Sequence, residues 1–292
     1  METPVGTAAT TTAYDHATKA GNCGDVWKHS VLTALVRAML ADRKSSSPFR
    51  YMESHAGAGR FSLNPKGSPF DWQKGVAAAA TLGIDCPTIP WLGWLSPGYS
   101  AGSRYDGSWM LVRRLLLEAG LDHRMDLFDT SNKVRDAIRG AVADDHRIHV
   151  SGKDGFAGIR STAASDLVLI DPAYKPEREW NQAADCAQSL ASRGIPVAVW
   201  YFIAWPTKPD ALVKRSGLTG IEVMWKPLGQ THNQNIHGAG ILLGGGAERF
   251  LPAFSGDLLK MVQALGWQAQ RRTSHDGRVV VDDAFALEVA GT

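Results

Sequence analysis

Strand-like and helix-like segments alternate along the middle of this chain, and this alternation limits the folds open to it. Residues 125–128 have the pattern of a short strand, and residues 131–142 that of a helix. Near-continuous apolar runs follow at 166–170 and 196–203, with a helical pattern at 180–193 between them. Such alternation predicts a parallel sheet, and continuous apolar runs are typical of strands covered on both faces. We therefore expect an α/β fold.

The flanking parts of the chain add elements of the same kind. Apolar residues recur at helical spacing over 25–43, and a strand is predicted over 49–52 after a polar break. Further elements are expected as strands at 220–225, 240–243 and 279–281, and as a helix at 257–265.

The chain length of 292 residues suits one elaborated α/β domain, which we place over 20–292. Residues 64–106 break the regular rhythm with Gly and Pro steps and contain Trp72, Trp91 and Trp94. We expect an inserted cap subdomain there. Residues 1–19 are rich in Thr and Ala and lack the apolar stretch of a secretion signal, so a flexible tail is predicted.

Composition narrows the class of protein. Hydrophobic residues make up 44% of the chain and charged residues 21%, and the apolar runs are too short to span a bilayer. We expect no membrane association, a cytoplasmic location, and a monomer or weak dimer. A formal net charge of +2 neither demands nor excludes an RNA partner. Cys23, Cys86 and Cys186 are far apart without a Cys-x-x-Cys pair, so no metal site is expected.

A glycine-containing loop follows the first predicted strand. Its sequence is Ser54-His55-Ala56-Gly57-Ala58-Gly59-Arg60. A strand that turns through glycines into a helix lets backbone N–H groups approach an anionic or carboxylate-bearing ligand. Gly57 and Gly59 are therefore candidate cofactor-binding residues.

Polar residues stand at the ends of four predicted strands, where ligands bind in open α/β sheets. These residues are Glu53 to His55, Asp129, Lys153 to Gly155, and Asp171. Asp129 suits a ribose diol, although it lies 70 residues beyond Gly59 rather than the usual spacing of about 20. A helix cap beside Ser131 explains Asp129 equally well. Asp154-Gly155 could meet an adenine edge, but pattern alone favours a tight turn.

The segment Asp171-Pro172-Ala173-Tyr174 resembles the Asp-Pro-Pro-Tyr loop of amino-methyltransferases. Hydrogen bonds from an exocyclic amine to Asp171 and to the Pro172 carbonyl would localise the amine lone pair and align it with a methyl donor. Tyr174 would offer the base an aromatic face. With the glycine-containing loop, this predicts a transferase that uses S-adenosylmethionine. The alternative is an ordinary strand-end Asp-Pro turn.

Several segments, in this order, resemble the RlmJ-like methyltransferases, which methylate the exocyclic amine of an adenine in 23S ribosomal RNA. The matching segments are 20–29, 54–61, Gly107-Ser108, Asp154-Gly155-Phe156 and 169–174. The resemblance covers about residues 14–243. It implies a Rossmann-like class I methyltransferase fold, with a mostly parallel seven-stranded sheet and an insertion after the first strand.

The resemblance also implies site residues. It puts Asp171 on the catalytic position, and Tyr14 on a tyrosine that contacts the substrate base. Lys28 and His29 carry no such signal by spacing, and a structural role is the simpler explanation for the histidine. The resemblance puts seven further residues on cofactor-binding positions, in addition to Glu53, Gly57 and Gly59. They are Lys28, His29, His55, Ser108, Asp129, Asp154 and Gly155.

Departures from the family pattern leave the acceptor open. Ala173 replaces the second proline of the loop, which restores an N–H and loosens the loop. Cys23 replaces a histidine, and Phe202 stands where the family has proline. The leading hypothesis remains adenine methylation in ribosomal RNA, with a basic rim around the site.

Two rival functions follow from the same residues. One is an S-adenosylmethionine-dependent enzyme acting on a small-molecule metabolite, or on the aminocarboxypropyl group of S-adenosylmethionine itself, with Asp171 as general base. The other is a non-catalytic RNA-binding module, which would have lost the chemistry while keeping Asp171, His55 and the glycine-containing loop. Salt-sensitive RNA binding would count against the metabolite hypothesis.

Overall fold

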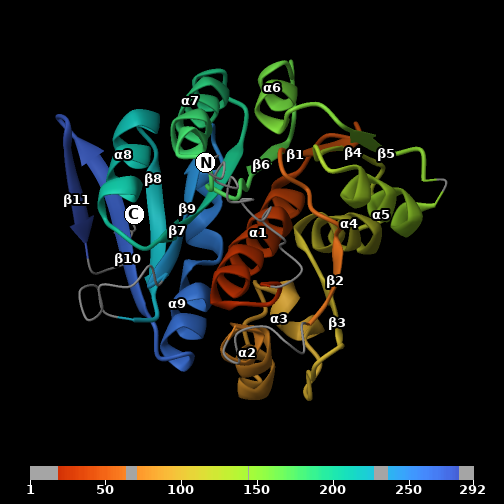
Figure 1. Cartoon of the computed structure of the whole chain (residues 1–292), viewed down its shortest axis with the longest axis horizontal. Coiled ribbons are helices and arrows are strands. Elements are labelled where there is room, and N and C mark those ends of the chain that lie inside the picture. Colours follow the sequence, from red (N-terminus) through yellow and green to blue (C-terminus); the bar gives the residue numbers. More distant parts are fainter. Residues whose placement is uncertain (1–18, 64–70, 144, 227–235, 283–292) are drawn as a thin grey trace, which may run out of the picture.

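A computed structural model of the chain describes residues 19–63, 71–143, 145–226 and 236–282. Within this part, helices cover both faces of a nine-stranded sheet with strand order β11-β10-β8-β9-β7-β6-β1-β4-β5 (Figure 1). The predicted α/β fold is confirmed. Across the described residues, no helix combines the length and apolar character needed to cross a bilayer.

Five neighbouring strands of the sheet run parallel. They are β5 (Ile148–Ser151), β4 (His123–Phe128), β1 (Phe49–Glu53), β6 (Leu167–Ile170) and β7 (Val197–Ile203). Next to β7, β9 (Gly238–Gly244) runs antiparallel and separates it from β8 (Thr219–Met224). These seven strands form the expected class I methyltransferase arrangement.

The sheet has two strands more than the seven predicted, added beyond this core. β10 (Gln268–His275) pairs antiparallel with β8, and β11 (Arg278–Asp282) pairs antiparallel with β10. Both lie at the sheet edge remote from β5 (Figure 1). Residues 268–275 read Gln-Ala-Gln-Arg-Arg-Thr-Ser-His, without alternating apolar residues, so hydrophobic periodicity does not reveal β10.

Alternate residues of the buried strands belong to two separate cores. Leu167 and Leu169 pack toward α1 (Cys23–Asp42), α4 (Ser108–Glu118) and α9 (Ser255–Ala264). Val168 and Ile170 join the core on the other face, under α6 (Gly155–Arg160), α7 (Arg178–Ser192) and α8 (Thr207–Ser216). The remaining helix of the core domain, α5 (Asn132–Val142), follows β4. Two buried faces explain why these strands read as continuous apolar runs.

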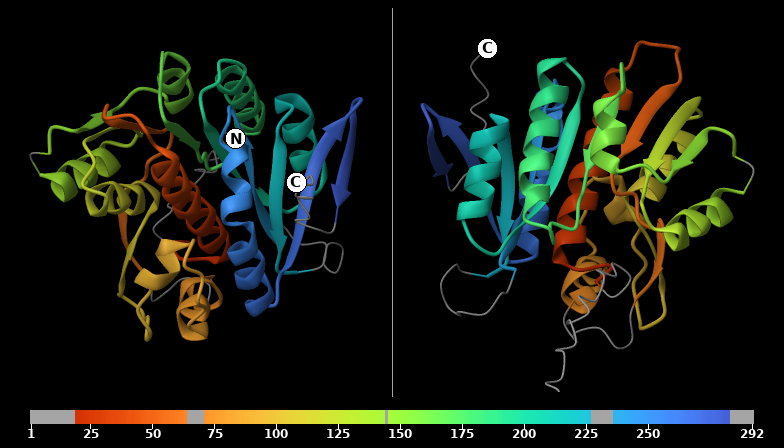
Figure 2. Two further views of the ribbon diagram at one scale, coloured as in Figure 1. Left: turned by 180° about the vertical axis from the view of Figure 1, so that it is seen from behind. Right: turned by 45° about the horizontal axis from the view of Figure 1, so that its top comes forward.

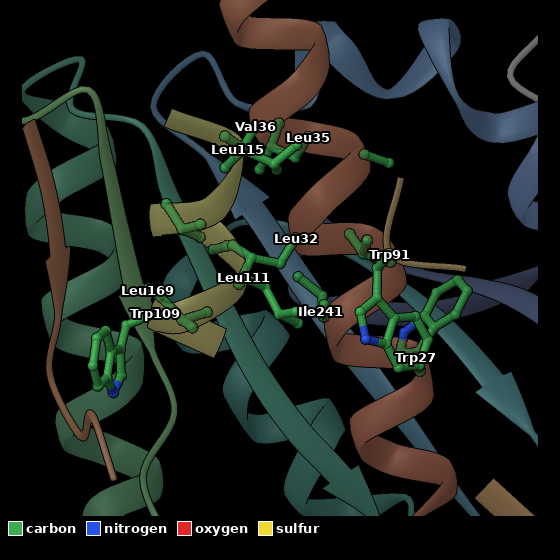
Figure 3. Close-up of a cluster of buried hydrophobic side chains, with 14 of the residues drawn as sticks. Trp27, Leu32, Leu35, Val36, Trp91, Trp109, Leu111, Leu115, Leu169 and Ile241 are labelled. Atoms are coloured by element: carbon green, nitrogen blue, oxygen red, sulfur yellow. The ribbon is translucent and has the colours of Figure 1, made fainter. Parts of the chain in front are cut away.

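The longest helix, α1, precedes the first strand and packs against the sheet and α4. Leu32 and Leu35 of α1 face Leu111 and Leu115 of α4 (Figure 3). This contact holds the middle of α1 against α4, and the same helix carries Lys28.

The segment between β1 and α4 contains short elements. Residues 73–77 form the π-helix η2 (Gln73–Ala77), followed by α2 (Ala78–Leu82) and α3 (Pro90–Trp94). β2 (Arg60–Ser62) and β3 (Arg104–Asp106) form a separate two-stranded sheet. α2 and α3 lie together at the bottom of the molecule in Figure 1 and in the left view of Figure 2. The buried Trp91 of α3 belongs to the α1 core.

Candidate active site

Asp171 lies directly after β6, between the parallel strands β1 and β7. Its side chain is 13% exposed, and its Oδ2 lies 2.8 Å from Lys28 Nζ. The catalytic candidate is therefore held by a residue of α1, at the sheet edge where ligands bind in α/β proteins.

Lys28 lies between two carboxylates. Its Nζ is 2.9 Å from Asp25 Oδ1, and the Lys28 and Asp25 side chains are 5% and 3% exposed. The ammonium also lies 5.6 Å from the centre of the Trp200 ring. Burial disfavours the charge on Lys28, but attraction to Asp171 and Asp25 outweighs burial and raises the lysine pKa. Lys28 was expected to bind cofactor; in the structure its ammonium is engaged with Asp171 and Asp25.

Asp129 closes the glycine-containing loop onto the end of β4. Its Oδ2 accepts a hydrogen bond from the Gly57 N–H at 3.2 Å, and its Oδ1 accepts one from the Ser131 N–H at 2.8 Å. Ser131, rather than Asp129, is the N-cap of α5. The spacing of 70 residues between Asp129 and Gly59 therefore does not keep Asp129 from the loop, because the intervening segment returns the chain beside β1.

The two loop glycines have different surroundings. Both have positive φ angles, 60° at Gly57 and 76° at Gly59. Among the described residues, a Cβ added to Gly57 would meet only Phe61 Cζ, at 3.4 Å. A Cβ added to Gly59 would lie 2.0 Å from the Trp109 ring, which is a collision. Gly57 therefore leaves room for a ligand. The structure explains Gly59 by packing against Trp109.

Glu53 is a fully buried carboxyl group at the end of β1. Its Oε1 accepts a hydrogen bond from the Ser108 hydroxyl, and its Oε2 accepts one from Tyr51 at 2.8 Å. Burial raises the pKa of Glu53 to about 8, despite the lowering effect of these two hydrogen bonds. Two predicted cofactor residues, Glu53 and Ser108, thus contact each other across the β1–α4 junction.

The His55 ring is influenced by carboxylates from three strand ends. Burial lowers its pKa, while the charges of Asp171, Asp129 and Asp154 raise it, so all three carboxylates lie close enough to influence the ring. His55 Nδ1 lies 2.8 Å from Ser54 Oγ. The ring packs edge-on against Phe156, with 4.9 Å between ring centres.

Asp154 and Gly155 have local structural roles as well. The Asp154 carboxylate caps α6 by accepting a hydrogen bond from the Ala157 N–H at 2.9 Å. A Cβ at Gly155 would lie 1.8 Å from the Ser54 carbonyl oxygen. Glycine is therefore needed for α6 to approach the end of β1, whether or not a ligand is bound.

The described ring contacts of His29 are with β3 and α3. The His29 ring hydrogen-bonds through Nδ1 to the Tyr105 hydroxyl, and it packs against Trp91 with 5.8 Å between ring centres. It is 1% exposed. These contacts support a structural role between α1, β3 and α3. Tyr14 lies outside the described residues.

Pro172 and Tyr174 form a buried part of the catalytic loop. Tyr174 has a φ of 54°, and its hydroxyl donates to the Trp200 carbonyl at 2.7 Å. Its ring lies 4.1 Å from that of Trp180 and is 5% exposed. This burial argues against an open stacking face for a base. Tyr174 instead fixes the path of the chain after Asp171.

Comparison with known families identifies the chain. The model of the family described as "Ribosomal RNA large subunit methyltransferase D, RlmJ" matches residues 46–228, more than half of the 292 residues. The chain belongs to this family. The resemblance seen in the sequence motifs is confirmed.

Two curated members of the RlmJ family are similar to this chain. The ribosomal RNA large subunit methyltransferase J of Escherichia coli (strain K12) is 25% identical over 221 residues, which cover 72% of this chain and 76% of that protein. The protein of the same name from Haemophilus influenzae is 24% identical over 227 residues, or 73% and 78% of the two chains.

A solved structure supports the fold. A protein from Legionella pneumophila superposes with a TM-score of 0.72 at 20% identity, covering 88% of this chain and 99% of that one. Most of the architecture is therefore shared at low sequence identity.

As an RlmJ family member, the chain is a methyltransferase whose methyl donor is S-adenosylmethionine. The residues at the strand ends fit this donor. Gly57 leaves space beside the loop backbone, and the carboxylates of Asp129 and Asp154 lie on neighbouring strand ends. They could accept hydrogen bonds from a ribose and an adenine. Asp171 lies beside this group, where an acceptor would meet the methyl.

Two residues that contact the site were not predicted from the sequence, namely Asp25 and Trp200. Asp25 stands three residues before Lys28 on a predicted helix, and this spacing is a signal for an ion pair on one helix face. Trp200 lies within the apolar run of β7, and nothing in that run distinguishes it from a core residue.

Proposed function

We propose that this enzyme transfers a methyl group from S-adenosylmethionine to the exocyclic amine of an adenine in large-subunit ribosomal RNA. The observation that carries the proposal is the Asp171 carboxylate, fixed by Lys28 at the end of β6. The family model and both curated relatives name ribosomal RNA, which supports the same class of acceptor.

Asp171 has the geometry of a hydrogen-bond acceptor for the amine. Among the described residues its ion pair with Lys28 uses Oδ2, which leaves Oδ1 to accept an amine N–H. A second hydrogen bond to the Pro172 carbonyl would hold the amine by both of its hydrogens. These two contacts localise the nitrogen lone pair and direct it at the methyl group.

The transfer needs no other reactant. Bound S-adenosylmethionine would supply the methyl group: the amine nitrogen would form the new N–C bond as the thioether S-adenosylhomocysteine leaves, and the released amine proton would pass to solvent. Lys28 keeps the carboxylate in one orientation, so the acceptor meets a preorganised site. Asp25 orients Lys28 from the same helix.

The test is transfer of label from methyl-labelled S-adenosylmethionine to unmodified large-subunit ribosomal RNA. After digestion, the nucleosides are separated by mass spectrometry, with a sample of already methylated RNA as control. Label in N6-methyladenosine is the expected result. Cofactor binding without labelled nucleoside would reject the RNA acceptor and favour the small-molecule metabolite, for which Ala173 and Phe202 near the catalytic loop are the motivating departures.

A further inference from the structure

One tryptophan is exposed at the edge of the sheet that carries Asp171. The chain has ten tryptophans, all within the described residues, and nine of them are buried or partly buried. Trp205 is 51% exposed. It follows the carboxyl end of β7 and precedes α8. A single exposed apolar residue is ordinary, whereas several gathered at one place mark an interaction surface.

Trp205 stands further along the chain than the residue that is level with Asp171. Ile170 is the register partner of Val199, so Asp171 is level with Trp200. Five residues separate Trp200 from Trp205, a chain distance of at most about 17 Å at strand spacing. Trp205 is therefore close enough to the catalytic position to contact a nucleotide beside the target.

A second exposed apolar residue, Ile236, lies at the same end of β7. Ile236 is 44% exposed and precedes β9, whose Gly238 is the register partner of Ile203 in β7. The His237 N–H donates to the Ile203 carbonyl at 2.7 Å, which fixes the start of β9 against the end of β7. The Ile236 carbonyl accepts a hydrogen bond from Trp225 Nε1 at 3.2 Å. Trp205 and Ile236 therefore flank one end of the β7–β9 pair.

Cations lie on two segments next to this edge of the sheet. Lys175 and Arg178 are exposed on the segment that follows Asp171. Lys208, in the first turn of α8, is 40% exposed and pairs with Glu177, which ties α8 to the segment that follows the catalytic loop. Exposed cations beside an exposed aromatic ring match a single-stranded nucleic acid, whose phosphates need cations and whose bases stack on rings.

We infer that the surface formed by Trp205, Ile236, Lys175 and Arg178 holds single-stranded RNA that flanks the target adenine, with one base stacked on the Trp205 indole. The inference rests on the proposed function, because it requires RNA as the acceptor. It adds a residue that determines which RNA conformation is accepted: a neighbouring base can stack on Trp205 only when it is unpaired.

The test measures binding of the full-length protein to a labelled oligoadenylate of about 12 nucleotides, a length chosen from typical site sizes, and to a duplex of equal length. Trp205→Ala should weaken single-strand binding about tenfold, because stacking on one ring is lost. Trp205→Phe should stay close to wild type, and duplex binding should not change. Leu117→Ala is the control, since Leu117 is 43% exposed near the far end of α4.

Three results would overturn the inference. Trp205→Ala could bind the single strand as wild type does, Leu117→Ala could weaken binding equally, or Trp205→Ala could abolish self-association in sedimentation without affecting RNA. Methyl transfer to ribosomal RNA by wild type is measured separately. If wild type labels RNA and Trp205→Ala leaves single-strand binding unchanged, the inference fails alone; if wild type neither binds nor labels RNA, the proposed function fails.

Discussion

Lys28 Nζ lies 2.8 Å from Asp171 Oδ2, although 143 residues separate them in the chain. The pair joins the first helix to the loop after β6. It explains how a loop whose second proline is replaced by Ala173 still holds its carboxylate in place. A buried ion pair therefore fixes the carboxylate of this loop.

Lys28→Met should reduce both turnover and stability. Loss of the ammonium leaves Asp25 and Asp171 without their cation, which costs about 3–5 kcal/mol in the free energy of unfolding. Misorientation of Asp171 should lower kcat by roughly 100-fold. The control is Lys19→Met. The side chains of Lys19 and its partner Asp71 are 45% and 25% exposed, so loss of this pair should cost at most about 1 kcal/mol. Stability is measured by urea unfolding. Equal losses of unfolding free energy in both variants would show that the buried pair does not stabilise the protein more than the exposed one.

Substitutions at the two loop glycines should separate cofactor binding from folding. Gly57→Val should abolish S-adenosylmethionine binding in calorimetry, because the side chain fills the open space beside the loop. Its positive φ adds a strain of about 1–2 kcal/mol. Gly59→Ala should lower the melting temperature more, since its Cβ would collide with Trp109. Normal cofactor affinity in Gly57→Val would show that the loop is not at the cofactor.

Glu53 should make stability depend on pH. Its pKa is about 8 in the folded state and near 4.5 when unfolded, so the folded state binds the extra proton between these values. The stabilisation is complete below about pH 4.5 and is lost as pH rises through about 8. Glu53→Gln should flatten the curve of unfolding free energy against pH. Between pH 5 and pH 9 this variant should lose less stability than the wild type loses. Urea unfolding at several pH values checks this; parallel curves would mean that Glu53 does not titrate in this range.

The extra strand β10 is joined to the core by a buried ion pair. Arg272 donates to Glu222, and their side chains are 2% and 0% exposed. Arg272→Met would leave Glu222 buried without its cation, at a cost of about 3–5 kcal/mol. The neighbouring Arg271→Met breaks a pair with Asp282 that is 32% and 43% exposed, and should cost at most about 1 kcal/mol. Chemical denaturation of both variants makes the comparison.

Much of the fold could be predicted because its strands are covered on both faces. The run of β6 and the helical spacing of α1 follow directly from burial. β10 could not be predicted in this way, since its residues are mostly half-buried and its central arginine is satisfied by Glu222. A strand that is buried through an ion pair leaves no apolar signature.

The candidate site was predicted in part. Asp129 and Asp171 were predicted because they follow the carboxyl ends of strands. In the structure the charges of both act on the His55 ring. The partner of Lys28 could not be predicted, because it depends on how α1 crosses the sheet edge. His29 hydrogen-bonds to Tyr105, which supports the structural role, and its role at the cofactor stays a prediction.

The central claim is that Asp171 acts on the acceptor and not on the cofactor. The most direct measurement compares wild type with Asp171→Asn, which keeps the shape of the side chain, in labelled methyl transfer to unmodified large-subunit ribosomal RNA and in calorimetric binding of S-adenosylmethionine. We predict a loss of transfer of at least about 1000-fold, with cofactor affinity unchanged. Transfer close to the wild-type rate, or a parallel loss of cofactor affinity, would contradict this role of Asp171.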